Sequence, residues 1–101
     1  MIRTFDGTIS RPSILFIKAE WCGHCQRAKP VMERVAHALG TGVPVIAIDA
    51  DTDEEAVKKL GVTSFPTIAI VDGAGHMFVH EGERTVRSIV SSACQRTLCP
   101  R

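Results

Sequence analysis

The stretch Ala19-Glu20-Trp21-Cys22-Gly23-His24-Cys25 decides how the rest of the chain is organised. Its two cysteines follow directly after an apolar run and precede a helical pattern. Cys22 is therefore expected at the start of a helix, where free backbone N–H groups and the helix dipole stabilise a thiolate. Cys25 falls on the same helix face and can close a disulfide with Cys22. The spacing favours a redox pair, with a static disulfide or half of a zinc site as alternatives.

Apolar runs on both sides of this stretch predict buried strands. Residues 13–18 contain four apolar residues in a row, and residues 43–48 are rich in β-branched side chains. Between them, residues 23–39 place apolar side chains at helical spacing, with Pro30 inside the pattern and Gly40 after it. Such a strand–helix–strand unit makes its two strands parallel through a right-handed connection.

The second half of the chain predicts a hairpin and a final helix. Residues 68–71 and 76–80 flank a Gly-rich turn and are expected to pair antiparallel. Apolar residues recur at helical spacing from 86 to 93. Residues 2–5 supply a further edge strand if they pair. We therefore expect an α/β fold in three layers, with a central mixed sheet of four or five strands and helices on both faces.

Three alternating aspartates between residues 49 and 53 superficially resemble a calcium loop. Glu54 stands where such a loop needs glycine, so the calcium interpretation fails. Thr52 with Glu55 fits a capping box instead, which predicts a short helix that ends at about Leu60. We expect no metal site in this chain.

The chain has 101 residues, a length that suits one domain. We predict a single domain over residues 1–101, with a shortened N-terminal segment at 1–12 and a C-terminal tail at 95–101. A net charge of +1 offers no basic surplus for nucleic acid, and no apolar run is long enough to span a membrane. The first seven residues contain no apolar signal region, so a cytoplasmic location is expected.

The chain resembles a known family at several positions. The run from Trp21 to Cys25 resembles the active site of the thioredoxin superfamily, and its Gly-His pair is similar to that of protein disulfide isomerase domains. Pro30 matches the proline of the family's active-site helix, Phe65-Pro66-Thr67 resembles its cis-proline loop, and residues 82–85 resemble the segment that opens its last helix. The segment before residue 13 is shorter than in the family, so the usual first helix should be reduced or absent.

This resemblance implies a single thioredoxin-like domain that acts as a thiol–disulfide oxidoreductase. Cys22 would be the exposed nucleophile, and Cys25, more buried, would resolve the mixed disulfide. The peptide bond before Pro66 would be cis, and Trp21, Phe65 and Pro66 would contact an extended protein or peptide substrate. The resemblance implies no cofactor, a redox partner such as a reductase or glutathione, and a monomer.

Five residues are expected to tune the active site: Trp21, Gly23, His24, Lys18 and Arg84. His24, which follows Gly23 between the cysteines, would favour the Cys22 thiolate when protonated or hydrogen-bonding. Because a stabilised reduced form makes the disulfide a better oxidant, this feature favours an oxidase or isomerase over a strong reductase. Arg84 matches the arginine that approaches the second cysteine in isomerase domains.

The chain departs from the family at two positions. Phe16 stands where the family has a buried acid, and Ala47 stands where thioredoxins often have a lysine on the next strand. The residues of the family's usual proton relay for Cys25 are therefore absent from these two positions. Lys18, at the end of the strand before the cysteines, is expected to compensate in part through its charge.

Two alternatives compete with the enzyme: a non-catalytic adaptor or chaperone module of the same fold, and a zinc-binding domain. A zinc site would need Cys94 and Cys99 beside the first pair, and the spacing is poor. Those two cysteines can form a disulfide of their own if the last helix ends between them. His37, His76 and His80 show no metal-ligand spacing and are expected on the surface or in strands.

Overall fold

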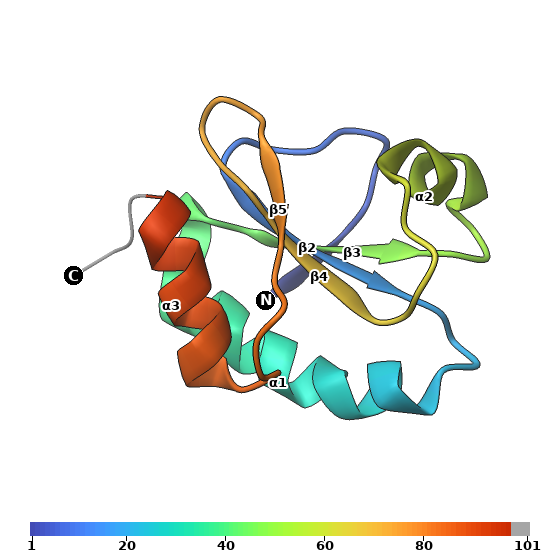
Figure 1. Ribbon diagram of the computed structural model, residues 1–101, viewed down its shortest axis with the longest axis horizontal. Coiled ribbons are helices and arrows are strands. Elements are labelled where there is room, and N and C mark those ends of the chain that lie inside the picture. The colour runs from blue at the N-terminus through green and yellow to red at the C-terminus, as the bar shows by residue number, and fades with distance from the viewer. Residues whose placement is uncertain (98–101) are drawn as a thin grey trace.

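The computed structural model describes residues 1–97, in which the apolar run after residue 12 forms the central strand of a sheet. The elements in chain order are β1 (Ile2–Thr4), β2 (Ser13–Lys18), α1 (Gly23–Leu39), the 3₁₀ turn η1 (Gly40–Gly42), β3 (Val45–Asp49), α2 (Glu54–Leu60), β4 (Thr67–Val71), β5 (Met77–Val79) and α3 (Val86–Arg96). The strand order is β1-β3-β2-β4-β5 (Figure 1).

The sheet is mixed, as the sequence predicts, and it has the fifth strand. β2 is parallel to β3 and antiparallel to β4, and β5 extends the sheet beyond β4 as a hairpin. β1 pairs in parallel with β3 at the opposite edge. The β2–β3 register places Phe16 opposite Ala47 and Lys18 opposite Asp49. Since side chains alternate along a strand, these two pairs lie on the same face of the sheet.

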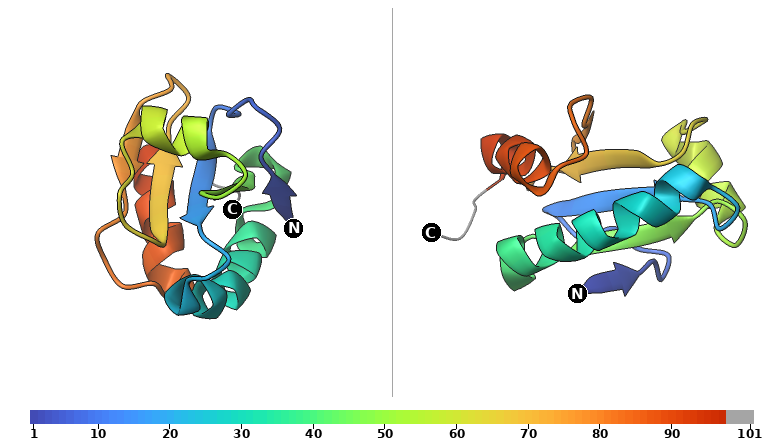
Figure 2. Two further views of the ribbon diagram at one scale, coloured as in Figure 1. Left: turned by 90° about the vertical axis from the view of Figure 1, so that its right-hand side faces the viewer. Right: turned by 90° about the horizontal axis from the view of Figure 1, so that it is seen from below.

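Helices cover both faces of the sheet, but unequally. α1 and α3 pack together on one face, with α1 along the bottom and α3 at the left in Figure 1, while α2 lies on the other. Ile14 and Phe16 of β2 point into the α1–α3 core, and Leu15 and Ile17 point into the α2 core. All four side chains are fully buried, which explains the uninterrupted apolar run. Figure 2 shows this three-layer arrangement from two further sides.

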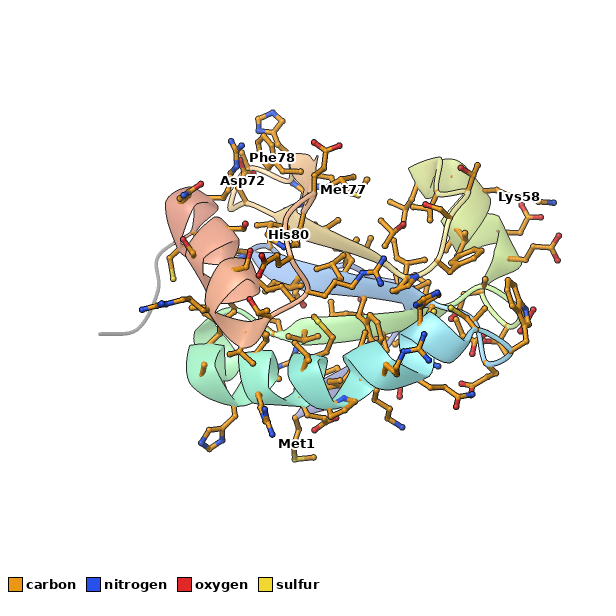
Figure 3. All side chains as sticks on the ribbon, turned by 60° about the horizontal axis from the view of Figure 1, so that its bottom comes forward. Met1, Lys58, Asp72, Met77, Phe78 and His80 are labelled. Atoms are coloured by element: carbon orange, nitrogen blue, oxygen red, sulfur yellow. The ribbon has the colours of Figure 1, made fainter. Side chains whose placement is uncertain are left out.

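The N-terminal segment, residues 1–12, contains the short strand β1 and no helix. Residues 5–12 form an irregular connection, as expected from its short length. Phe5 and Ile9 of this connection pack against the α2 face of the sheet. They leave a groove of about 820 Å³ between the connection, α2 and the β4–β5 hairpin, where Met77 (labelled in Figure 3) contributes to the lining.

The predicted capping box at the start of α2 is wrong. The N-cap residue is Asp53, and it makes no side-chain capping bond. The Thr52 hydroxyl bonds the Asp53 carboxylate, and the Thr52 backbone N–H donates to the carboxylate of Asp49. The turn before α2 is thus held by Asp49, and no bond joins Thr52 to Glu55. The helix ends at Leu60 as predicted, with the following Gly61 at φ 73°.

The expected tail at residues 95–101 begins too early. α3 continues through Arg96, because no helix breaker stands there, and both the backbone N–H and the hydroxyl of Thr97 donate to the Ala93 carbonyl. Cys94 lies inside α3, whereas Cys99 and the possible pairing of the two lie outside the described residues. Within residues 1–97, no helix has the length and apolar character needed to cross a membrane.

Candidate active site

The two cysteines of the opening stretch lie where the central strand ends and helix α1 begins. This corner is on the right in Figure 1 and faces the viewer in the left panel of Figure 2. Its loop is fixed by two hydrogen bonds: the Cys22 backbone N–H donates to the Ala19 carbonyl at 3.1 Å, and the Gln26 side chain donates to the Glu20 carbonyl at 3.0 Å. The chain therefore delivers both thiols to the carboxyl end of β2, where α/β sheets place their sites.

Cys22 is the N-cap residue of α1. Its backbone is extended, at φ −89° and ψ 112°, and its sulfur accepts the backbone N–H of Cys25 at 3.1 Å. The hydrogen bond with the Cys25 thiol is the largest cause that lowers the pKa of the Cys22 thiol. Burial opposes it, while the backbone N–H groups of Cys25 and His24 and the charge of Arg84 add to it. The sulfur thus occupies a position at which a thiolate is favoured.

Cys25 lies one helical turn further into the protein. Burial, followed by the hydrogen bond with Cys22, raises the pKa of the Cys25 thiol to about 11. Its neighbours in the core are Ala19 and Cys22, with Ala50 and Phe65 packed against them. The pKa values of two thiols only three residues apart are therefore shifted in opposite directions from the ordinary value of 9.0.

The expected order of exposure is found, but Cys22 is less accessible than the sequence indicates. Cys22 is 7% exposed and Cys25 is 2% exposed. Cys22 is therefore not an exposed residue in the ordinary sense. The reason is that the loop after β2 and the Phe65 region pack around it.

The loop before β4 forms the other wall of the site. The peptide bond between Phe65 and Pro66 is cis, as predicted, and a second cis bond, between Arg11 and Pro12, was not expected. The Cys22 thiol donates to the Phe65 carbonyl at a sulfur–oxygen distance of 3.7 Å. Trp21 is 70% exposed and meets the Phe65 ring edge to face at 5.9 Å. An exposed aromatic side chain next to a nucleophile is suited to contact a substrate.

Lys18 is held between two carboxylates beside the cysteines. Its Nζ atom bonds Glu20 and also lies 3.4 Å from the Asp49 carboxylate. Burial alone would lower the pKa of Lys18, but these two bonds outweigh burial and raise it. The lysine is therefore charged, and its charge acts on Cys25, where it lowers the thiol pKa against the effect of burial. The charge of Lys18 thus acts on the second cysteine.

The two departures from the family pattern are apolar in the structure too. Phe16 is fully buried in the α1–α3 core, and the half-buried Ala47 opposite it packs against the same core. Neither position can supply a proton acceptor. The charged pair Lys18–Asp49 lies two residues further along the same two strands. Sequence reasoning missed the part played by Asp49, although the paired ends of adjacent parallel strands could have indicated it.

His24 acts on the site differently from the expectation. Its ring Nδ1 atom accepts a hydrogen bond from the Arg27 guanidinium at 2.8 Å, since arginine can only donate. The contribution of His24 to Cys22 is a hydrogen bond from its backbone N–H, which helps to lower the pKa of the Cys22 thiol. Arg27 is a second residue that sequence reasoning missed, and its position three residues after His24 on one helix face is the signal that could have revealed it.

Arg84 lies in the segment between β5 and α3. The preceding Glu83 carbonyl accepts from the ring of His80, at 2.8 Å, and the other ring nitrogen of His80 bonds the Ser92 hydroxyl of α3, also at 2.8 Å. Figure 3 labels His80 between the hairpin and α3. His80 thus anchors the Arg84 segment. No group of three potential metal ligands lies together in residues 1–97.

Comparisons with known proteins agree with this geometry. Residues 3–95 match the family model for thioredoxin. The chain is 33% identical over 88 residues to protein disulfide-isomerase A3 of Gallus gallus, covering 85% of this chain and 17% of that protein. It is 33% identical over 100 residues to protein disulfide-isomerase erp38 of Neurospora crassa, covering 92% of this chain and 27% of that one. The chain therefore spans less than a third of these relatives.

Solved structures show the same fold. The first thioredoxin domain of mouse protein disulfide-isomerase A4 is 30% identical, with a TM-score of 0.75 over 85% of this chain and 63% of that one. The J-Trx1 fragment of ERdj5 gives a TM-score of 0.84 at 21% identity, over 93% of this chain and 49% of that one. The five-stranded sheet and the cysteine pair at the start of α1 agree with these matches. The chain belongs to the thioredoxin family.

Proposed function

We propose that this domain is a thiol–disulfide oxidoreductase that exchanges disulfides with protein substrates through Cys22 and Cys25. The observation that carries this proposal is the position of Cys22 at the N-cap of α1, where its sulfur accepts the Cys25 backbone N–H at 3.1 Å and lies 3.7 Å from the Phe65 carbonyl. This placement goes with thiol pKa values shifted in opposite directions, lowered at Cys22 and raised at Cys25. A lowered pKa supplies a thiolate that can attack, and a raised pKa keeps the second thiol protonated until it is needed. The relatives named as disulfide isomerases support the same activity.

Reduction of a substrate proceeds in two exchanges. The Cys22 thiolate attacks one sulfur of the substrate disulfide. A bond forms between the two sulfurs, the substrate S–S bond breaks, and the second substrate sulfur leaves as a thiolate that takes a proton from water. Cys25 then loses its proton and attacks the Cys22 sulfur, which forms the Cys22–Cys25 disulfide and releases the first substrate sulfur. Two electrons pass from the protein to the substrate, and the reverse sequence oxidises a substrate dithiol.

Lys18 assists the second exchange. The Cys25 thiol has to ionise although its pKa is raised to about 11, and no acid is present at the position of Phe16. The Lys18 ammonium group favours the Cys25 thiolate, and the carboxylates of Asp49 and Glu20 hold that group in place.

The redox balance favours oxidation or isomerisation over strong reduction. Backbone N–H groups stabilise the Cys22 thiolate, which exists only in the reduced protein. Stabilising the reduced form raises the reduction potential of the pair. We expect a potential above that of thioredoxin, which is about −270 mV. Equilibration with glutathione buffers measures this value, and a potential at or below that of thioredoxin would reject the oxidising direction.

Turnover of insulin disulfides with dithiothreitol as the dithiol donor tests the activity itself. The wild-type protein should accelerate the reduction of insulin, and Cys22→Ser should act no faster than dithiothreitol alone. Full activity in Cys22→Ser would refute the assignment. A protein that binds insulin without turnover would instead be an adaptor or chaperone module.

The redox partner, the oligomeric state and the compartment belong to the same proposal. A reductase or glutathione would reset the pair, and the domain would act as a monomer in the cytoplasm. Sedimentation of the purified protein tests the monomer, and fractionation of source cells with an antibody to the chain tests the compartment. Recovery of the chain only in a membrane-enclosed, oxidising compartment would contradict the cytoplasmic assignment.

A further inference from the structure

A small hollow beside the active site has an unusual lining. Its volume is about 160 Å³, and its walls are His24, Arg27, Ala28, Val31 and Arg84. Ala28 is buried and Val31 half-buried, so the floor is apolar, while the two arginines and the histidine form the polar rim. No aspartate or glutamate lines the hollow. At about 30 Å³ per water in the liquid, this volume has room for the carboxylate end of a side chain.

The two arginines at this hollow have no carboxylate partner within residues 1–97. The ion pairs of that part of the chain involve Lys18, Lys58 and His76. Arg27 donates one N–H to the His24 ring, and its other four N–H donors remain available for a ligand. A Cβ atom built on Gly23 would lie 3.7 Å from Arg27 Nη1, so the guanidinium folds back over the first turn of α1, towards the cysteines. Two like charges that converge without a counter-charge favour an anion from outside.

The hollow adjoins the reacting sulfur. His24 and Arg27 belong to the same two turns of α1 as the cysteine pair, and the charge of Arg84 acts on the Cys22 thiol. The Arg84 segment is fixed in place through the bonds of His80 to Glu83 and Ser92. When a substrate cysteine is bonded to Cys22, the substrate residues next to that cysteine therefore come close to the polar rim of the hollow.

We propose that this hollow binds a substrate carboxylate, so that the domain prefers disulfides whose cysteine has an acidic neighbour. The carboxylate comes either from an aspartate or glutamate next to the cysteine of a protein substrate or from glutathione disulfide, which carries the same group. This inference rests on the proposed function, because it concerns the substrate of the same thiol. Guanidinium groups bind carboxylates through paired N–H donors, and the apolar floor accommodates the methylene groups of the side chain.

The test uses matched peptides in which one cysteine forms a mixed disulfide with thionitrobenzoate, whose release is coloured. The residue after the cysteine is Glu, Gln or Lys, and each rate constant with reduced protein is divided by the rate constant with dithiothreitol. This ratio removes the intrinsic reactivity of each peptide. We expect the Glu peptide to react about threefold to tenfold faster than the Gln peptide at low salt. The preference should shrink as the salt concentration rises.

Variants locate the effect. Arg27→Gln and Arg84→Gln should each bring the Glu-to-Gln ratio close to one, whereas Arg34→Gln, an exposed arginine of α1 outside the hollow, should leave it unchanged. Glutathione disulfide and its ethyl ester form a separate arm. A preference for the free acid that depends on Arg27 and Arg84 supports the hollow, and its presence in only one arm shows which source of carboxylate is used.

The outcomes also separate this inference from the proposed function. A wild-type protein that releases thionitrobenzoate from all peptides with equal corrected rates, and does not distinguish glutathione disulfide from its ester, overturns the carboxylate hollow alone. A protein that reacts with none of the peptides overturns the activity as well. The salt dependence of the wild-type protein provides a second readout that needs no variant, and a ratio insensitive to salt also counts against the hollow.

Discussion

The surroundings of Cys22 and of Cys25 differ in what they offer a thiol, although only two residues separate the cysteines. Cys22 receives the Cys25 backbone N–H at 3.1 Å at the open end of α1 and feels the charge of Arg84. Cys25 is enclosed by Ala19, Ala50 and Phe65 and raised in pKa mainly by burial. A displacement of one helical turn is thus sufficient to separate the environment of the nucleophile from that of the resolving thiol. Since the two side chains are chemically identical, the difference comes from the hydrogen bond between the two thiols, from burial and from the backbone donors at Cys22.

The largest expected effect is a difference in mixed-disulfide trapping between the serine variants of the two cysteines. With Cys25→Ser, the resolving exchange is lost, so a mixed disulfide between Cys22 and the substrate should accumulate and multiple turnover should stop. Cys22→Ser should form no such species, because Cys25 is buried and protonated at neutral pH. Non-reducing gel electrophoresis with an oxidised protein substrate, after acid quenching, distinguishes them. Equal trapping by both variants would remove the distinction.

A second substitution, at Phe16, tests the apolar core beside the buried cysteine. This side chain is fully buried beneath the sheet, so Phe16→Ala should lower the free energy of unfolding by about 3–5 kcal/mol. Val79→Ala, on a half-exposed position of β5, should change it by less than about 0.5 kcal/mol and serves as the control. Urea unfolding followed by circular dichroism measures both. Similar small losses in the two variants would show that Phe16 is not a central core residue.

A smaller effect is expected when Lys18 loses its charge. Since the Lys18 charge favours the Cys25 thiolate, Lys18→Met should slow the resolving exchange by about twofold to fivefold and leave the first exchange nearly unchanged. Asp49→Asn should act in the same direction, because Asp49 helps to hold the lysine. Stopped-flow measurement of the two phases, with Lys29→Met on the exposed face of α1 as control, separates them. An effect confined to the first phase would assign Lys18 to Cys22 instead.

Much of the fold could be predicted because its signals are local. The four-residue apolar run of β2, the helical spacing of α1 and the Gly61 stop each reflect one element, and each lies where predicted. The capping box at Thr52 was wrong because Asp49, on the preceding strand, takes the backbone N–H that a cap would satisfy. The end of α3 was placed too early because no residue after Cys94 is a helix breaker until Pro100.

The candidate site was predictable in its thiols, but the pairing of its charged side chains was not. The spacing of Cys22 and Cys25 fixes the reactive pair, whatever surrounds it. The contact of Lys18 with Asp49 depends on strand register, and that of Arg27 with His24 on side-chain orientation. Neither feature can be read from spacing between residues remote in sequence. Sequence reasoning also made Cys22 more exposed than it is, since the packing of Phe65 around it is a tertiary contact.

The titration of both thiols in the intact reduced protein tests the difference between Cys22 and Cys25 most directly. Carbon-13 labels on the two Cβ atoms report each thiol separately by NMR as the pH is raised. The Cys22 signal should shift at a pH below the ordinary pKa of 9.0, because a lowered pKa means that the thiolate is already formed there. The Cys25 signal should shift only near pH 11. Cys25 titrating before Cys22, or both titrating together near 9.0, would contradict the assignment of nucleophile and resolving thiol.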